Sequence, residues 1–149
     1  MTKQQLSDKW AICFDKITDR LRKYAYVKLV FYEKKAFTHF KSLRKEYGAE
    51  HAYADFYYFR LDFDAREMVN ELLSPEEICY LELICPLPGE EEEAIIFPLD
   101  EKLLKIIVRL NASEILFSTI YFTASDRCER MRTTWWGNYG KEYICFKDR

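Results

Sequence analysis

Residues 133–146, with the sequence TTWWGNYGKEYICF, contain two stretches of β-branched and aromatic residues on either side of Gly137-Asn138-Tyr139-Gly140. Such stretches favour strands, and glycine and asparagine favour tight turns. The sequence therefore predicts an antiparallel hairpin between residues 133–136 and residues 142–146. Similar composition predicts further strands at residues 26–33, 53–63, 94–97 and 115–123. The strand at 94–97 is expected to pair back across the acidic segment that precedes it.

The longest amphipathic pattern lies near the N-terminus. Over residues 6–24, apolar side chains recur every three or four positions, and charged side chains fill the places between them. This spacing is typical of a helix with one buried face. We therefore expect one continuous helix that packs a buried stripe on the sheet, formed by Leu6, Trp10, Cys13, Phe14, Ile17, Leu21 and Tyr24.

Capping residues indicate the other helices. A helix over residues 36–47 is predicted to end at Gly48, because glycine readily adopts the left-handed conformation of a helix end. Residues 78–85 are compatible with a helix or a strand. Three polar residues that precede apolar patterns are predicted to begin further helices: Asp64, Ser74 and Asp100.

The order of these elements decides the fold class. Helices and strands do not alternate strictly, which favours an α+β fold over a doubly wound parallel sheet. The 149 residues are 49% apolar and contain no linker or internal repeat. We expect a single α+β domain over residues 1–149, with a mostly antiparallel sheet packed by the N-terminal amphipathic helix and two or three further helices.

Charge is distributed unevenly along the chain. The net charge of −2 combines +7 over residues 1–47, −2 over 48–63, −11 over 64–101 and +4 over 102–149. Two interpretations remain open. The opposite charges neutralise one another within the fold, or the acidic quarter forms a surface that attracts a basic partner.

The sequence also bears on the chain's environment. No apolar run approaches the ~20 residues that span a bilayer, and the N-terminus lacks the apolar stretch of a signal peptide. We expect a cytoplasmic protein that binds no metal or cofactor and forms no disulfide. Its five cysteines have no paired spacing and are expected to be free, mostly buried thiols: Cys13, Cys79, Cys85, Cys128 and Cys145.

Few elements of a catalytic site are visible. The four glycines fall at separate predicted turns, so the chain lacks the clustered glycines of a phosphate-binding loop. His39 is expected to be an exposed helix residue, and His51 to lie where a strand begins. Asp62 and Asp64 would share one face of a strand, close to Asp55, where acids are more often solvated than catalytic. A catalytic site that assembles only in the fold stays open as an alternative.

A basic and aromatic segment near the C-terminus is the candidate for binding single-stranded nucleic acid. Arginines would contact phosphates and indole rings would stack on bases. Adjacent residues of a strand point to opposite faces, however, so only one of the two tryptophans is expected to be accessible. The residues of this alternative site are Arg127, Arg130, Arg132, Trp135 and Trp136.

The prediction for function is a non-catalytic interaction or inhibitor protein, a class that includes immunity proteins, antitoxins and phage-encoded inhibitors. Such proteins need a rigid scaffold, a charged face and exposed aromatic anchors, but no reaction chemistry. The expected partner is a basic protein. The predicted contact residues are Glu76, Glu77, Tyr80, Glu90, Glu91, Glu92, Glu93 and Tyr139. The alternative is a small enzyme or nucleic-acid-binding protein that uses the C-terminal arginines and tryptophans.

Overall fold

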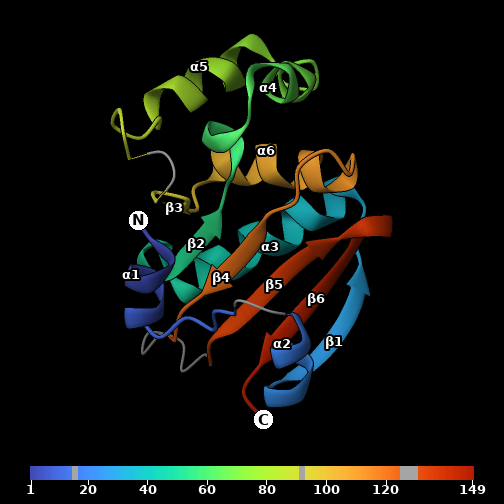
Figure 1. Ribbon diagram of the computed structural model, residues 1–149. Coiled ribbons are helices and arrows are strands. Elements are labelled where there is room, and N and C mark those ends of the chain that lie inside the picture. Colours follow the sequence, from blue (N-terminus) through green and yellow to red (C-terminus); the bar gives the residue numbers. More distant parts are fainter. Residues whose placement is uncertain (15–16, 91–92, 125–130) are drawn as a thin grey trace.

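A six-stranded antiparallel sheet forms the centre of the protein (Figure 1). The computed structural model describes residues 1–14, 17–90, 93–124 and 131–149, with the side chains at 17, 19 and 20 left out. The strand order is β1-β6-β5-β4-β2-β3. The strands are β1 (Ala25–Val30), β2 (Ala52–Asp55), β3 (Ile96–Pro98), β4 (Thr119–Phe122), β5 (Thr133–Asn138) and β6 (Glu142–Lys147).

The predicted hairpin is confirmed and supplies two central strands. β5 pairs with β6 in a register that places Trp135 opposite Cys145. A short 3-10 turn, η3 (Tyr139–Lys141), joins them. Gly137 is required for packing, because a Cβ there would lie only 2.7 Å from Nδ2, the side-chain amide nitrogen of Asn111.

Two long helices cover one face of the sheet. These are α3 (Glu33–Tyr47) and α6 (Glu101–Ala112), which lie side by side behind the strands in Figure 1. As expected, α3 ends at Gly48, whose φ is 100°, and Asp100 caps α6 by accepting a hydrogen bond from the Leu103 amide. The main apolar core lies between these helices and the sheet, and it confirms the α+β fold class.

Two shorter helices, α4 (Phe63–Asn70) and α5 (Pro75–Leu83), extend beyond the sheet near α6 (Figure 1). The strand predicted over residues 53–63 is correct only for residues 53–55 and wrong for the rest. The chain leaves the sheet after Asp55 and forms a 3-10 turn, η2 (Tyr58–Arg60). Asp62 rather than Asp64 then caps α4 by accepting a hydrogen bond from the Ala65 amide at 2.8 Å.

The continuous N-terminal helix is also wrong. The chain forms α1 (Lys3–Asp8), turns at Trp10 with a φ of 68°, and resumes helical structure only at α2 (Ile17–Lys23). Trp10 is 74% exposed instead of buried. An extended segment, residues 11–14, crosses the second sheet face, where Ile12 O accepts a hydrogen bond from Thr134 Oγ1 at 2.8 Å. Extended chain covers about twice the length per residue that a helix covers, which suits it to this wide surface.

Three further details differ from expectation. The strand near residue 96 pairs with β2, placing Phe97 opposite Ala54, and does not fold back across the acidic segment. His39 is half-buried between the rings of Phe31 and Trp135 because it lies on the inner side of α3. Strand β4 (Thr119–Phe122) is shorter than the strand predicted over residues 115–123.

The cysteines divide in a way that differs from the predicted buried set. Cys13, Cys79, Cys85 and Cys145 are free thiols, but Cys79 and Cys85 are exposed and only Cys145 is buried. Cys128 lies outside the described residues. Cys79 is exposed because it falls on the outer side of α5. No helix in the described part of the chain is both long and apolar enough to cross a bilayer.

Candidate functional site

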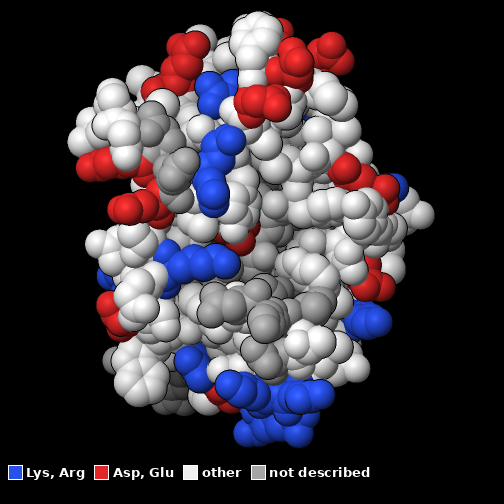
Figure 2. All heavy atoms as spheres, viewed as in Figure 1, with Lys and Arg blue, Asp and Glu red and all other residues white. Residues whose placement is uncertain are grey.

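Helices α4 and α5, which carry five of the acidic residues in the acidic quarter of the sequence, lie beyond the sheet. In Figure 2, aspartates and glutamates gather at the top of the view, over α4 and α5, and lysines and arginines gather at the lower end, where Figure 1 places α2 and the C-terminus. Helix α2 therefore lies at the other end of the molecule and does not neutralise α4 and α5, whereas α1 lies beside β3. Neutralisation of these acids therefore depends on cations closer to α4 and α5.

Helix α5 sorts its two adjacent glutamates onto different sides. Ser74 begins the helix through a reciprocal cap: its hydroxyl accepts from the Glu77 amide at 3.1 Å, and Glu77 Oε1 accepts from the Ser74 amide at 3.0 Å. This cap fixes the rotation of the first turn. Glu77 consequently faces Arg109 on α6, whereas Glu76 is exposed at the edge of the cleft between α5 and α6 that Lys102 and Lys105 also line.

Glu77 is part of the internal structure. Its Oε1 lies 2.5 Å from Nη1 of Arg109, and only 14% of its side chain is exposed. Burial by itself raises the pKa of this carboxyl, but the Ser74 hydrogen bonds and the Arg109 guanidinium outweigh it, and the pKa lies below its ordinary value. Arg109 also donates to Leu72 O at 3.2 Å. The pair joins α5 to α6.

Tyr80 has a similar internal role. Its hydroxyl donates a hydrogen bond to the Asp100 carboxylate, and its ring lies 5.4 Å from Nζ of Lys102. Burial and the Asp100 carboxylate raise the pKa of Tyr80, so the phenol stays protonated. A cleft of about 340 Å³ lies between α5 and α6, and the cations Lys102, Lys105 and Arg109 line it opposite the α5 glutamates.

The charged groups on the solvent-exposed side of α4, α5 and the segment that follows them are almost entirely acidic. Over residues 62–93 the described chain exposes eight carboxylates and no cation, because Arg66, the single basic residue there, is half-buried. We call this set of exposed side chains the acidic helical surface. Its carboxylates belong to Asp62, Asp64, Glu67, Glu71, Glu76, Glu82, Glu90 and Glu93. The predicted contacts Glu91 and Glu92 lie outside the described residues.

Apolar side chains interrupt the acidic helical surface. Phe63, Met68, Leu83 and Leu87 are 76%, 57%, 82% and 67% exposed. A groove of about 450 Å³ lies between η2, α4 and α5, and its α5 side is lined by Ile78, Leu81, Glu82 and the following Cys85. Arg66 closes one side by donating to Phe59 O at 3.2 Å. The surface therefore combines negative charge with places for apolar anchors.

Tyr139, the remaining predicted contact, lies elsewhere. It is 68% exposed and packs against Phe117, with ring centroids 4.8 Å apart. Its neighbour Gly140 donates to Glu114 Oε1 at 2.8 Å, beyond the C-terminal end of α6. Tyr80 of α5 contacts Asp100, at the N-terminal end of α6. Helix α6 is about 18 Å long at 1.5 Å per residue, so Tyr80 and Tyr139 lie near its opposite ends. The structure does not bring Tyr139 to the acidic helical surface.

The alternative nucleic-acid site is not assembled by its described members. Arg132 makes a bidentate ion pair with Asp148, with both nitrogen–oxygen distances 2.9 Å. Trp135 is 7% exposed in the main core, and Trp136 packs on the other sheet face. The two indoles thus point to opposite sides, as the strand pattern predicts. Arg127 and Arg130 lie outside the described residues.

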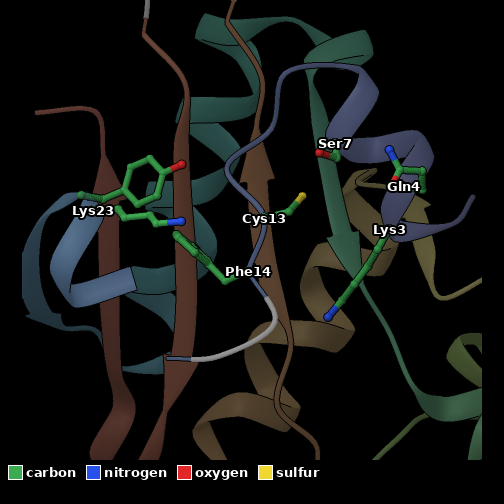
Figure 3. A pocket seen from close by; sticks show the side chains of 7 residues that line it. Lys3, Gln4, Ser7, Cys13, Phe14 and Lys23 are labelled. Atoms are coloured by element: carbon green, nitrogen blue, oxygen red, sulfur yellow. The ribbon is translucent and has the colours of Figure 1, made fainter. Parts of the chain in front are cut away.

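A basic hollow of about 280 Å³ lies between α1 and α2 (Figure 3). Lys3 from α1 and the Lys23 side chain lie on opposite sides of Cys13 and Phe14. Gln4 and Ser7 on its rim are exposed. The hollow lacks the closed, apolar walls typical of small-molecule sites.

Catalytic chemistry has little support among the described residues. His51 Nδ1 lies 2.8 Å from Thr123 Oγ1, and its Nε2 lies 3.7 Å from a Glu50 carboxylate oxygen. Thr123 is only 3% exposed, so this hydroxyl does not face solvent as a nucleophile would. Asp55 is buried and accepts from the Thr119 amide at 2.7 Å. The described residues contain no group of three histidine, cysteine or acidic side chains placed to hold a metal.

Comparisons of the chain with models of protein families, with curated proteins and with solved structures found no match.

Sequence reasoning did not identify the internal role of Glu77, although a signal was present. Glu77 precedes Tyr80 and Leu81 by three and four residues, so it lies on the apolar side of α5. The complementary stripe is also visible, because Lys102, Lys105 and Arg109 are spaced at helical intervals along α6. What the sequence does not show is that these two stripes meet.

Proposed function

We propose that this protein is a non-catalytic binding protein that docks a basic partner protein on the acidic helical surface. The observation that carries the proposal is the concentration of charge just described: eight exposed carboxylates over the described residues between 62 and 93, with the exposed cations Lys102 and Lys105 across the cleft from Glu76. Inhibitors and immunity proteins are one class that works in this way. The catalytic side chains belong, in this proposal, to the partner.

The free carboxylates support recognition by electrostatic steering. Like charges held together on one surface repel one another and slightly weaken the fold. Glu77 is relieved of this repulsion by Arg109, but no described cation contacts Glu76 or Glu82. A basic partner would relieve the repulsion between these exposed acids and would be attracted from a distance, which mainly raises the association rate.

The apolar side chains support affinity. Interfaces gain most of their binding energy from a few apolar or aromatic anchors, and surrounding charges add specificity. Phe63 and Leu83 are exposed on α4 and α5, and the groove between these helices can receive one apolar side chain from the partner. The expected partner segment therefore carries lysines or arginines around an apolar residue.

The test uses two variants with the same net charge. The double variant Glu71→Lys and Glu76→Lys reverses two exposed acids of the surface, and Asp8→Lys with Glu142→Lys makes an identical charge change elsewhere. A partner captured from the native cell is joined to the chain with a zero-length carbodiimide cross-linker, which links carboxylates to lysines in contact. We expect cross-links from residues of the acidic helical surface, and the Glu71/Glu76 variant should lose those that involve Glu71 and Glu76.

The association rate gives the second readout. It should fall at least about tenfold in the Glu71/Glu76 variant at low salt, and much less in the Asp8/Glu142 control. Equal binding of the partner by both variants would contradict the proposal. So would a captured partner whose cross-links map to the opposite end of the molecule.

A further inference from the structure

The two edges of the sheet are finished in different ways. At one edge, β3 has only three residues and includes Pro98, which has no N–H to donate. The chain's own N-terminus also pairs with it: the Ile96 amide donates to Met1 O at 3.0 Å, and the Met1 amino group donates to Ile96 O at 3.1 Å. This edge is closed to another strand.

The β1 edge has none of these protections. Its six residues, AYVKLV, include no proline and one charged residue, Lys28. The Phe31 amide donates to Lys141 O, on the β6 side, and successive residues of a strand point their backbone groups in alternate directions. Tyr26, Lys28 and Val30 therefore point their N–H and C=O groups away from β6. In the described part of the chain, no segment pairs with these groups.

The side chains of β1 are exposed as well. Tyr26, Val27 and Val30 are 47%, 44% and 58% exposed, although they are apolar and belong to the sheet. A long, exposed, apolar edge strand is a site where another strand adds to the sheet, and most proteins protect such an edge. Figure 1 shows β1 as the outermost strand on its side of the molecule.

The charge around β1 indicates what would pair there. Exposed cations are present on the strand itself at Lys28, just before it at Arg22 and Lys23, and next to it at Lys147, which lies opposite Ala25 on β6. The acids near the far end of the strand are occupied or half-buried: Glu33 lies 3.8 Å from Arg109, and Glu142 is half-buried. The lower end of Figure 2 shows the resulting basic surface.

We propose that the β1 edge binds an extended, acidic segment of a partner protein by β-strand addition. The segment would pair with the backbone of Tyr26, Lys28 and Val30 and extend the sheet to seven strands. Main-chain hydrogen bonds supply affinity in this mode, and alternate side chains supply specificity. A carboxylate belongs opposite Lys28, and β-branched residues belong beside Val27 and Leu29. This surface is separate from the acidic helical surface and does not depend on it.

A second copy of the chain is a poorer occupant. Antiparallel pairing of β1 with itself would bring the cations of two identical basic surfaces together, including Lys28, Lys147 and the α2 residues. Like charges at or near opposite positions of a strand pair are destabilising. An acidic segment meets the same backbone edge with attraction instead of repulsion.

The first test measures the edge directly. Hydrogen exchange followed by NMR on the free protein should show fast exchange for the amides of Tyr26, Lys28 and Val30 and slow exchange for those of Val27 and Leu29. Sedimentation should show that this edge does not pair two copies. A dimer in which the three outward amides are protected would overturn the proposal in favour of a self-paired edge.

The second test uses a phage-displayed library of random dodecapeptides as the probe. Selected peptides should alternate acidic and β-branched residues, and a synthetic one should protect the three outward amides when it binds. Lys28→Pro removes one outward N–H without removing a β6 hydrogen bond and should weaken binding by about fivefold or more. Lys28→Ala keeps the N–H and should weaken binding less.

Backbone N-methylation of the selected peptide is the matching change on the ligand and leaves the protein intact. Methylation at alternate positions should abolish binding, and methylation at the positions between them should not. Selection of peptides without acidic residues would overturn the proposal. Peptides that bind without protecting the β1 amides, or no selected peptide at all, would overturn it too.

Discussion

The two sides of α5 differ in what their residues contribute. On the inner side, Leu81 is 1% exposed in the core, and Glu77 is paired with Arg109. On the outer side, Leu83 is 82% exposed, and Glu76 is exposed at the edge of the cleft between α5 and α6. The two leucines and the adjacent pair Glu76 and Glu77 make this nine-residue helix an internal control. The difference teaches that the same residue types stabilise the fold on one side and are free to bind on the other.

The largest effect is expected from the leucines. Leu81→Ala should lower the free energy of unfolding by about 2–5 kcal/mol, because it leaves a cavity in the core. Leu83→Ala should change it by less than about 0.5 kcal/mol, as exposed substitutions usually do. Urea unfolding of the two variants measures the difference. Similar losses in both would show that the outer side of α5 is also part of the fold.

The glutamates should show a smaller version of the same contrast. Glu77→Ala leaves the Arg109 guanidinium half-buried without this partner and removes one arm of the helix cap, so we expect a loss of about 1–2 kcal/mol. Glu76→Ala should leave the unfolding free energy almost unchanged and should slow association with a basic partner. If Glu76→Ala destabilised the protein as strongly as Glu77→Ala, the division between structural and free charge would be incorrect.

The pH dependence of stability sharpens the contrast further. The folded-state pKa of Glu77 lies below its ordinary value of 4.5, so the unfolded chain binds more protons than the folded one as the pH falls past that value. The stabilisation from Glu77 is present above pH 4.5 and is lost as the pH falls through the lowered folded pKa. Glu77→Gln keeps the cap acceptor but cannot ionise.

Unfolding free energies measured from about pH 6 to about pH 3 should therefore converge for the wild type and Glu77→Gln toward the acidic end. Glu76→Gln is the matched control and should run parallel to the wild type throughout. A constant difference between the wild type and Glu77→Gln across this range would mean that the pair with Arg109 does not depend on the Glu77 charge.

How much of this was predictable depends on whether the deciding interaction is local. The end of α3 at Gly48, the start of α5 at Ser74 and the β5–β6 hairpin depend on neighbouring residues, and all three follow from the sequence. The pairing of Glu77 with Arg109 joins residues 32 positions apart. Its two stripes are visible along the chain, but their contact is a property of the tertiary structure.

The prediction of one continuous N-terminal helix is wrong for the same reason, because the interaction that decides the conformation of this segment is not local. Its spacing satisfies a helix over residues 6–24, but the second face of the sheet needs an apolar cover. Ile12 and Phe14 supply that cover in extended conformation, and Ile12 meets β5 through the Thr134 hydroxyl. Periodicity identifies which residues are apolar at regular intervals. It does not show that a sheet face will select an extended chain over a helix.

The smallest expected effect tests this correction at Trp10. In a continuous helix with Trp10 on its buried stripe, Trp10→Ala would cost several kcal/mol, and glycine would be worse than alanine by about 1 kcal/mol. In the observed structure the side chain is 74% exposed and the backbone φ is 68°, a conformation that glycine adopts without steric cost. Trp10→Ala should therefore change stability by less than about 0.5 kcal/mol. Trp10→Gly should be more stable than Trp10→Ala by up to about 1 kcal/mol, because a Cβ is unfavourable at positive φ. Urea unfolding of the two variants gives the sign of this difference, which is opposite for a helix and for a left-handed turn. Alanine more stable than glycine at this position would restore the continuous helix and remove the extended segment from the second sheet face.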